Sequence, residues 1–589
     1  MADFTLYNLV SGYERRESGE RDFFVRNISG SVTGAKRLSG SRLERACLYL
    51  SRLVSYTTAR AWGMLLLGFG LLSVIINFVK DYLNLYDGVP LSSLIAGAVI
   101  SIIAIPLITV DKPIAIASQE YILTDYIVHE FFCIKRMHRD GAQRGISPAV
   151  MLVIGLVLAG VGYFLPMPYM IFGAVGLLYL YLAFTSPEFS FLAIFLVMPY
   201  LTLLPHHELI LGALVLVTLF SYGRKVLLGK RVFALEQYDI VLFLMLIFVL
   251  ISGIFIKGIE SFESSVTMIL LAMGYILAGN LVTNRRLADC VIHAVIISSV
   301  PISVMSTVQF VSAAVAAGAL PEGVSATFGS PEVLAVYMIV VVALSLYFAI
   351  GAATVGGKIL YSLISLLSAA ALFSTLCANA VLAALFGLLA LLAVRARRGS
   401  GILLGLLSAL PYAVLLLPAQ LAEKISPALA ALVSRWHISL RMLGDNLFTG
   451  VGMGADSFRE EYFKYSGEYA DSSSSFILEI GVEAGIFALA LFLVIVLVRL
   501  VHRTRYRLYV RNSQVRDVAY ITSSALVALL AFGSFSYIWA DMTMYYLFWC
   551  VFGLGSAAMR IAKREHDDRV GYFVDGSSLE ASSIDITLR

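Results

Sequence analysis

The chain has 589 residues, of which 59% are apolar and 14% charged, and its mean hydropathy is +0.86. Soluble globular proteins carry about 25% charged residues, so this composition excludes a soluble fold. Stretches of about 20 apolar residues recur along the chain and predict an all-α polytopic membrane protein. The net charge of +4 comes from basic residues between these stretches and predicts no nucleic-acid partner. Five cysteines without paired spacing predict no disulfide framework and no metal site.

Residues 1–60 form a basic segment with ten Lys and Arg and without the apolar centre of a signal peptide. The positive-inside rule therefore keeps this segment in the cytoplasm. The first transmembrane helices are expected within 61–184, and a larger transmembrane domain within 185–562. Hydropathy predicts about sixteen transmembrane helices in all.

Later basic clusters, such as "IKRMHR", "RARR" and "RIAKRE", all fall on the cytoplasmic side when spans are counted from the N-terminus. An even number of spans, with both termini cytoplasmic, agrees best with this pattern. The polar tail 563–589 is then cytoplasmic, and one long loop, 419–474, is external. The expected location is the cytoplasmic (inner) membrane.

The first half of this loop, about 425–443, is predicted to be a helix that breaks at Gly444. His437 and Arg441 are four residues apart and share a helix face, whereas Arg435 points elsewhere. One interpretation is an amphipathic helix that lies on the membrane, with its arginines at lipid phosphates.

The stretch "DNLFTGVGMGADSF" follows this helix and contains Gly450, Gly452 and Gly454. A phosphate-binding loop would follow a strand and open a helix, and a calcium loop would need oxygen ligands at alternate positions; neither pattern is present. The glycines therefore predict tight turns at the membrane surface.

Three stretches, in this order, resemble the O-antigen ligase and O-antigen polymerase superfamily. The first has a span that ends near Gln309, followed by a turn of Gly329, Ser330, Pro331 and Glu332. The second is "RWHISLRMLGDNLFTGVGMGADSF", which begins at Arg435. The third is "SSSSFILEIGVEAG", in which Leu478, Glu483 and Gly485 fit the pattern. The resemblance covers about residues 280–500.

This resemblance implies a membrane glycosyltransferase of cell-envelope polysaccharide biosynthesis. Such an enzyme ligates or polymerises a glycan that it takes from an undecaprenyl-pyrophosphate carrier outside the membrane. The implied partners are a lipid-linked oligosaccharide, a glycan or other cell-surface acceptor, and membrane lipids. No cofactor is implied. The chain departs from the family pattern at Ser474, where the family has its catalytic His, and at Ala378, where it has Arg. A third departure is the loop arginine, which in the family stands about one helical turn further upstream of the tryptophan than Arg435 does from Trp436.

The reaction needs cations for the two phosphates and a base for the acceptor hydroxyl. We expect Arg435, Arg441, Gln309, Glu479 and Glu483 to bind substrate. The expected catalytic residues are Asp471 and His437, as displaced bases, together with Ser474.

Two of these candidates have a structural alternative. Asp471 could instead cap the helix that begins near Ser475. Glu483, between Gly481 and Gly485, could instead form a structural hydrogen bond where helices pack closely.

Two other functions stay open. One is a polysaccharide or anion transporter or flippase, which would favour an internal repeat and broken helices in matching halves. The other is a relative that binds the carrier without turnover.

Overall fold

The computed structural model describes residues 42–575 with short gaps at 83–90, 133, 135, 137–144, 163, 165–166, 229–230, 237–238, 256–257, 319–322, 353, 396–399, 417–423, 506–512 and 540. Most of the predicted basic segment 1–60, and the tail from 576 onward, lie outside the described residues. The described chain is helical, and its β-structure is an isolated bridge between Thr58 and Pro113.

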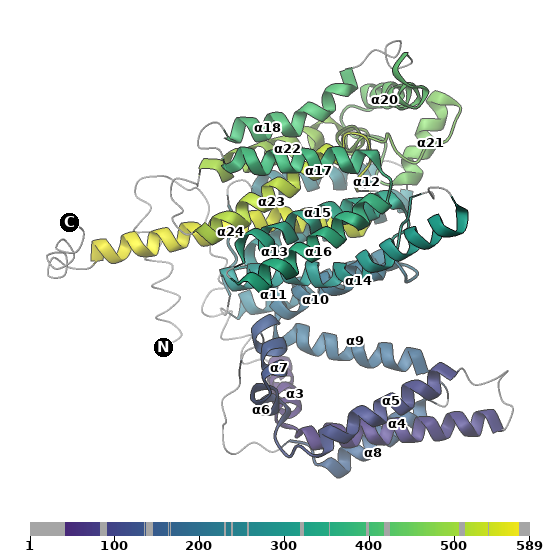
Figure 1. Cartoon of the computed structure of the whole chain (residues 1–589), viewed down its shortest axis with the longest axis vertical. Coiled ribbons are helices and arrows are strands. Elements are labelled where there is room, and N and C mark those ends of the chain that lie inside the picture. Colours follow the sequence, from purple (N-terminus) through teal and green to yellow (C-terminus); the bar gives the residue numbers. More distant parts are fainter. Residues whose placement is uncertain are drawn as a thin grey trace. The chain divides into compact units, whose positions relative to one another are not determined.

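The chain divides into two compact units. Unit 2 comprises residues 28–191 and 217–232, and its helices are α3 (Arg42–Tyr56), α4 (Ala59–Tyr82), α5 (Leu91–Ile108), α6 (Ile114–Glu120), α7 (Ile122–Asp125), the π-helical η1 (Tyr126–Phe131), α8 (Pro148–Val161) and α9 (Met167–Thr185) (Figure 1). Helices α10 (Pro187–Leu201) and α11 (His207–Leu227) each contribute residues to both units.

Unit 1 contains residues 192–216 and everything from Phe233 onward. Its remaining helices are α12 (Asp239–Phe255), α13 (Gly258–Leu281), α14 (Arg285–Ala317), α15 (Pro331–Gly351), α16 (Val355–Ser374), α17 (Ala378–Arg395), α18 (Ser400–Ala409), the 3₁₀-helical η2 (Leu410–Leu416), α20 (Pro427–Asp445), α21 (Ala455–Ser466), α22 (Phe476–Arg505), α23 (Ser513–Phe532) and α24 (Met542–Asp575). The long helices of this unit run in broadly the same direction in Figure 1.

The described residues contain eight helices that are long and apolar enough to cross a membrane. They lie in α4, α11, α13, α14, α15, α16, α22 and α24. In eight further apolar helices the residues with described side chains number 10–17, fewer than the about 20 residues that a perpendicular crossing needs. The chain is therefore an all-helical membrane protein. The count of sixteen spans, the side of each connection and the domain boundaries from sequence stay predictions.

The apolar first part of α24, Met542–Ala562, lies in the interior of unit 1, and the rest of the helix extends beyond the other helices (Figure 1). All of the residues in the most apolar stretch of α24 are buried inside the protein, whereas only 17% of those in the corresponding stretch of α16 are buried. Close approach of α13 to α24 depends on small residues, because a Cβ at Gly553 would lie 2.5 Å from the carbonyl oxygen of Tyr275. Helix α22, which carries the third motif, packs on α12 within the same unit.

Candidate functional site

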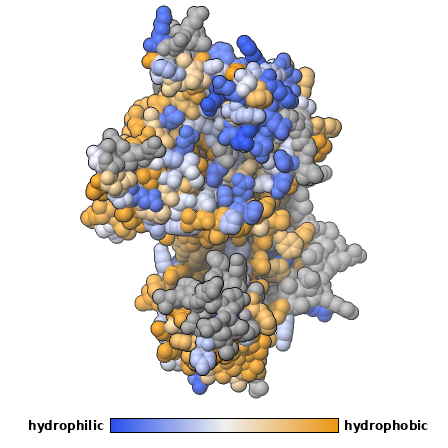
Figure 2. Space-filling model, turned by 90° about the vertical axis from the view of Figure 1, so that its right-hand side faces the viewer, coloured by the Kyte–Doolittle hydropathy of each residue, from blue (hydrophilic) through white to orange (hydrophobic). Residues whose placement is uncertain are grey.

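Residues 424–475, here called the loop region, fold into a compact structure on helix α22. Helices α20 and α21 share an apolar core with the first turns of α22: Val433, Trp436, Met442, Leu443, Val451, Phe458, Tyr462, Leu478 and Val482. Hydrophilic side chains gather in the upper part of the face in Figure 2, which is the side toward which α20 and α21 lie in Figure 1. We call this end of unit 1 the loop end.

Helix α20 begins with Ser426 at the N-cap position and Pro427 at the first helical position, where its missing N–H costs nothing. The helix continues through Gly444 and ends at Asp445, slightly beyond the predicted break. Its buried face includes Trp436, which is 1% exposed. Because protein already covers this face, α20 is not held by lipid contacts alone.

The glycine stretch docks into a break in α22. Gly485 has φ 85° and ψ 171°, which interrupts the helix. Beside the break, the N–H of Val451 donates to the carbonyl of Val482 at 2.8 Å, and the N–H of Ile486 donates to the carbonyl of Leu447 at 2.8 Å. These main-chain bonds satisfy backbone groups that the broken helix leaves unpaired.

The glycines are required by backbone geometry at this break. Gly450 and Gly454 have φ values of 70° and 98°, in the region that favours glycine. A Cβ at Gly450 would lie 2.2 Å from the carbonyl oxygen of Glu483, and one at Gly485 would lie 2.6 Å from that of Phe448. The predicted tight turns are confirmed, and they pack against α22; their position at the membrane surface stays a prediction.

Two carboxylates of α22 face the loop region from inside the protein. Glu479 is 0% and Glu483 2% exposed. Glu479 Oε2 accepts a hydrogen bond from the N–H of Ser473 at 2.5 Å. Glu483 accepts from the N–H of Gly454 at 3.2 Å and from the hydroxyl of Tyr537 at 2.9 Å. The structural alternative for Glu483 is thus visible as hydrogen bonds to two separate segments.

Arg435 and Ser474 meet at the loop end although 39 positions separate them. Arg435 Nη1 donates to Ser474 Oγ at 2.6 Å. Ser474 has φ 56°, a left-handed conformation that is uncommon outside glycine. Backbone strain of this kind persists only where the surroundings impose it, and it gathers at functional sites. Burial raises the pKa of the Tyr462 hydroxyl, and the nearby Arg435 guanidinium acts in the opposite direction.

The interior of the loop end contains four buried polar atoms without a hydrogen-bond partner among the described residues. They are Trp436 Nε1, Ser439 Oγ, Ser475 Oγ and Glu479 Oε1. Buried polar atoms are normally satisfied by protein or by water. Trp436 and Ser439 lie on α20, Ser475 directly precedes α22, and Glu479 lies in its first turn, so the interior of the loop end retains unused hydrogen-bonding capacity.

The remaining predicted site residues lie elsewhere. His437 and Arg441 share the exposed face of α20, as predicted, while Arg435 is half-buried. Asp471 is 68% exposed and pairs with Arg459 of α21 at 2.5 Å. Gln309 is half-buried on α14. Within the described chain, no hydrogen bond or ion pair joins the Arg435–Ser474 pair to Arg441, Gln309, Asp471 or His437.

Sequence reasoning missed Arg459, Ser473, Tyr462 and Tyr537. Arg459 has a local signal, since Asp456 stands three residues earlier on the same helix and contacts it at 3.5 Å. The other three have no signal in the sequence, because each contacts a segment that is distant in the chain or belongs to a tight turn.

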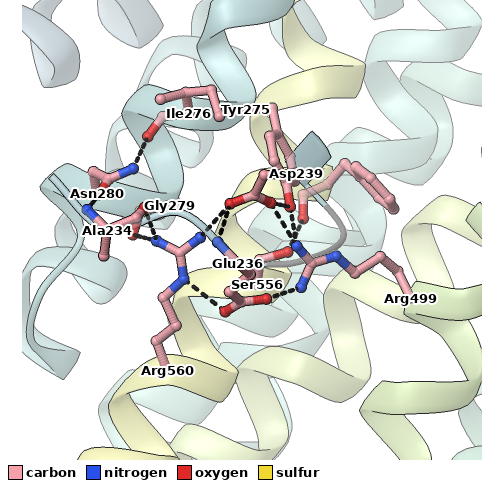
Figure 3. A network of polar contacts seen from close by, with 11 residues as sticks. Ala234, Glu236, Asp239, Tyr275, Ile276, Gly279, Asn280, Arg499, Ser556 and Arg560 are labelled. Atoms are coloured by element: carbon pink, nitrogen blue, oxygen red, sulfur yellow. Dashed lines mark hydrogen bonds and ion pairs between the residues drawn. The ribbon is translucent and has the colours of Figure 1, made fainter. Parts of the chain in front are cut away.

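A second polar cluster lies near the opposite end of α22 (Figure 3). Arg499 donates to Glu236, to Asp239 at 2.7 Å and to Tyr275. Arg560 of α24 donates to Glu236 at 2.7 Å and to Asp239 at 3.3 Å. Two arginines and two carboxylates balance in charge and bind one another. We call this cluster the ion network and interpret it as structural, because it ties α22 and α24 to the start of α12.

Within the part of the chain that the structure describes, no three His, Cys, Asp or Glu side chains gather in a way that would hold a metal ion. No protein-family model matches the chain, and no match is found among the curated proteins compared with it.

Proposed function

We propose that this protein transfers or polymerises a glycan from an undecaprenyl-pyrophosphate carrier at the outer face of the cytoplasmic membrane, in cell-envelope polysaccharide biosynthesis. The acceptor hydroxyl attacks the anomeric carbon of the donor sugar, and the bond from that carbon to the pyrophosphate oxygen breaks. The hydroxyl proton passes to a base, and the carrier pyrophosphate leaves. Arginine stabilises the departing pyrophosphate, because its planar fork matches phosphate oxygens.

The observation that carries this proposal is the contact between Arg435 and Ser474. The resemblance places an arginine in its second motif and a catalytic histidine in its third, at the position of Ser474. In this fold Arg435 contacts Ser474, although the family's arginine stands about one helical turn further upstream of the tryptophan than Arg435 does, and Ser474 has a left-handed backbone of the kind that gathers at functional sites. Ser475 and Glu479, close to Ser474 along the chain, each have a buried oxygen without a hydrogen-bond partner among the described residues, which leaves polar capacity beside this turn.

A carrier-binding protein without turnover is the second candidate, and Ser474 itself favours it. A serine hydroxyl cannot act as a base near neutral pH without an adjacent base. Asp471 is paired with Arg459, and His437 lies on the exposed face of α20. A phosphate-binding arginine would remain in such a protein while the base is absent.

The first experiment measures binding of undecaprenyl pyrophosphate to purified Arg435→Ala, Arg435→Lys and Arg441→Ala proteins. We expect Arg435→Ala to weaken binding by about ten-fold or more, because a charge-assisted hydrogen bond to phosphate is lost. Lysine should restore binding only partly, because the fork is lost. Arg441→Ala tests the second expected arginine, and we expect it to weaken binding less, because Arg441 is exposed and makes no contact with Ser474 within the described chain. Unchanged binding in Arg435→Ala would remove the loop region from the carrier site.

The second experiment separates the enzyme from the carrier-binding protein. Transfer of glycan from a lipid-linked donor is measured with Asp471→Asn, His437→Gln and Ser474→His. If a displaced base is used, one of the first two should lose about 10²- to 10⁴-fold in rate. Full activity in both would exclude these bases. An inactive parent that gains transfer with Ser474→His would identify a carrier-binding relative without chemistry.

A further inference from the structure

The first two turns of α22, residues 476–484, are separated from the rest of the helix by the break at Gly485. We call them the half-helix. The half-helix carries Glu479 and Glu483, which are four residues apart and therefore lie on one face. Both are buried, although a buried carboxylate is costly unless it accepts hydrogen bonds. The hydrogen bonds that each carboxylate accepts offset the cost of its burial.

The two carboxylates hold different segments. Glu479 accepts from the N–H of Ser473, which is the residue before Ser474. Within the same turn, Ser473 Oγ donates to the carbonyl of Ser475 at 3.0 Å. A backbone fixed on both sides of Ser474 keeps that residue in its left-handed conformation, with Oγ toward Arg435.

Glu483 holds the glycine stretch instead. One oxygen accepts from the N–H of Gly454, and the other from the hydroxyl of Tyr537, which belongs to the connection between α23 and α24. The carbonyl of Glu483 also accepts from the N–H of Gly452 at 3.3 Å and from Ser252 Oγ of α12 at 2.6 Å. The docked glycine stretch and the Ser474 turn thus share one rigid support.

We infer that Glu479 and Glu483 are positioning residues with separate tasks: Glu479 sets the Arg435–Ser474 pair, and Glu483 sets the docked glycine stretch. Neither has to touch the substrate. The inference rests on the proposed function only where carrier binding is the readout, since the geometry of the two segments can be measured without any ligand.

The test measures backbone hydrogen exchange in the full-length protein in detergent, for the parent, Glu479→Ala, Glu479→Gln and Glu483→Ala. We expect Glu479→Ala to speed exchange of the Ser473 amide by about ten-fold or more, with little change at Gly454. Glu483→Ala should give the opposite pattern. Glu479→Gln should restore protection at Ser473, because its amide oxygen can still accept the bond. Tyr537→Phe is a matched control that leaves the Gly454 bond in place.

Two outcomes would overturn the inference. Faster exchange at both Ser473 and Gly454 in each single variant would show that the half-helix merely unfolds. Unchanged exchange at both amides would show that the carboxylates hold neither segment.

Carrier binding separates this inference from the proposed function. If both hold, Glu479→Ala should weaken binding of undecaprenyl pyrophosphate, and the double variant with Arg435→Ala should be no weaker than Arg435→Ala alone, because both changes act on one pair. Selective exchange in a parent protein that binds no carrier would keep the positioning role and reject the function. Full additivity in the double variant would reject the role of Glu479 in setting Arg435.

Discussion

Arg435 and Arg441 lie six positions apart on one helix, and their surroundings differ. Arg435 is half-buried against Ser474, whereas Arg441 is exposed on the face that also carries His437. A joint clamp on one pyrophosphate would need both guanidinium groups on the same side. We therefore propose that carrier binding depends on Arg435 and that Arg441 meets lipid headgroups at the surface.

Asp471 and Glu479 also differ in burial, since Asp471 is exposed and Glu479 is buried. Asp471 binds Arg459 in solvent, where water screens an ion pair and it contributes little to stability. This pairing raises the pKa of Arg459, through its hydrogen bond to Asp471. Glu479 is buried one turn inside α22 and binds a backbone N–H. Removing Asp471 should leave the fold intact, which makes Asp471→Asn a clean test of chemistry.

The ion network gives a prediction at the scale of one residue. Burial alone would raise the pKa of Glu236, but Arg499 and Arg560 outweigh burial and lower it from about 4.5 to about 2. A lowered folded-state pKa means stability that is present above pH 4.5 and is lost as the pH falls through 2. A shift of this size corresponds to roughly 2–4 kcal/mol of stability.

We expect Glu236→Gln to melt at a lower temperature than the parent at pH 6, because it leaves buried arginine charge uncompensated. The difference should shrink as the pH falls from 4.5 to 2, since the parent then loses the same charge. The apparent melting temperature in detergent across this range is the measurement. Parallel pH curves for the two proteins would contradict the lowered pKa of Glu236.

At the scale of elements, the break in α22 and the glycine stretch depend on each other. Irregular backbone inside a membrane helix is tolerated where protein satisfies its polar groups. Here the chain from Leu447 to Gly454 supplies those partners. The stretch binds Glu483, which lies one helix turn from Glu479, and Glu479 binds the Ser474 turn. The docking of the stretch and the Ser474 turn are therefore linked through the half-helix.

Two glycine substitutions test this dependence. Gly450→Ala should destabilise the protein by ~2 kcal/mol or more, because φ is positive and the new Cβ would clash with the carbonyl of Glu483. Gly444→Ala is the matched control, because that site is helical with open space around it, and it should gain about 0.4–1 kcal/mol. Thermal unfolding of both variants is the measurement. Equal stabilities would mean that the stretch is not docked.

At the scale of the whole molecule, the predicted orientation in the membrane rests on the placement of basic connections rather than on any contact. A cysteine in place of Glu468, which is exposed after α21, should react with an impermeant thiol reagent in intact cells. A cysteine in place of Ser513, the first residue of α23, should not. Both are made in a chain whose five natural cysteines are replaced. The reverse pattern would invert the topology and place the loop end in the cytoplasm.

The sequence by itself determined the class of the protein, since composition and recurring apolar stretches leave a helical membrane protein as the remaining class. It also determined the helix of the loop region within a few residues, and the separation of Arg435 from the face shared by His437 and Arg441. These are local properties: helix periodicity and turn chemistry act over a few positions, so a sequence records them directly.

The tertiary structure decided which distant residues meet. Arg435 meets Ser474 across 39 positions, and Arg499 meets Glu236 across 263. Such contacts depend on how helices stack and where α22 breaks, and no local pattern encodes either. The glycines illustrate the division: the sequence predicted their turns, but only the fold shows that a side chain at Gly450 would meet the backbone of a helix more than thirty residues later. Backbone approach of this kind is set by packing, which is a property of the whole folded chain.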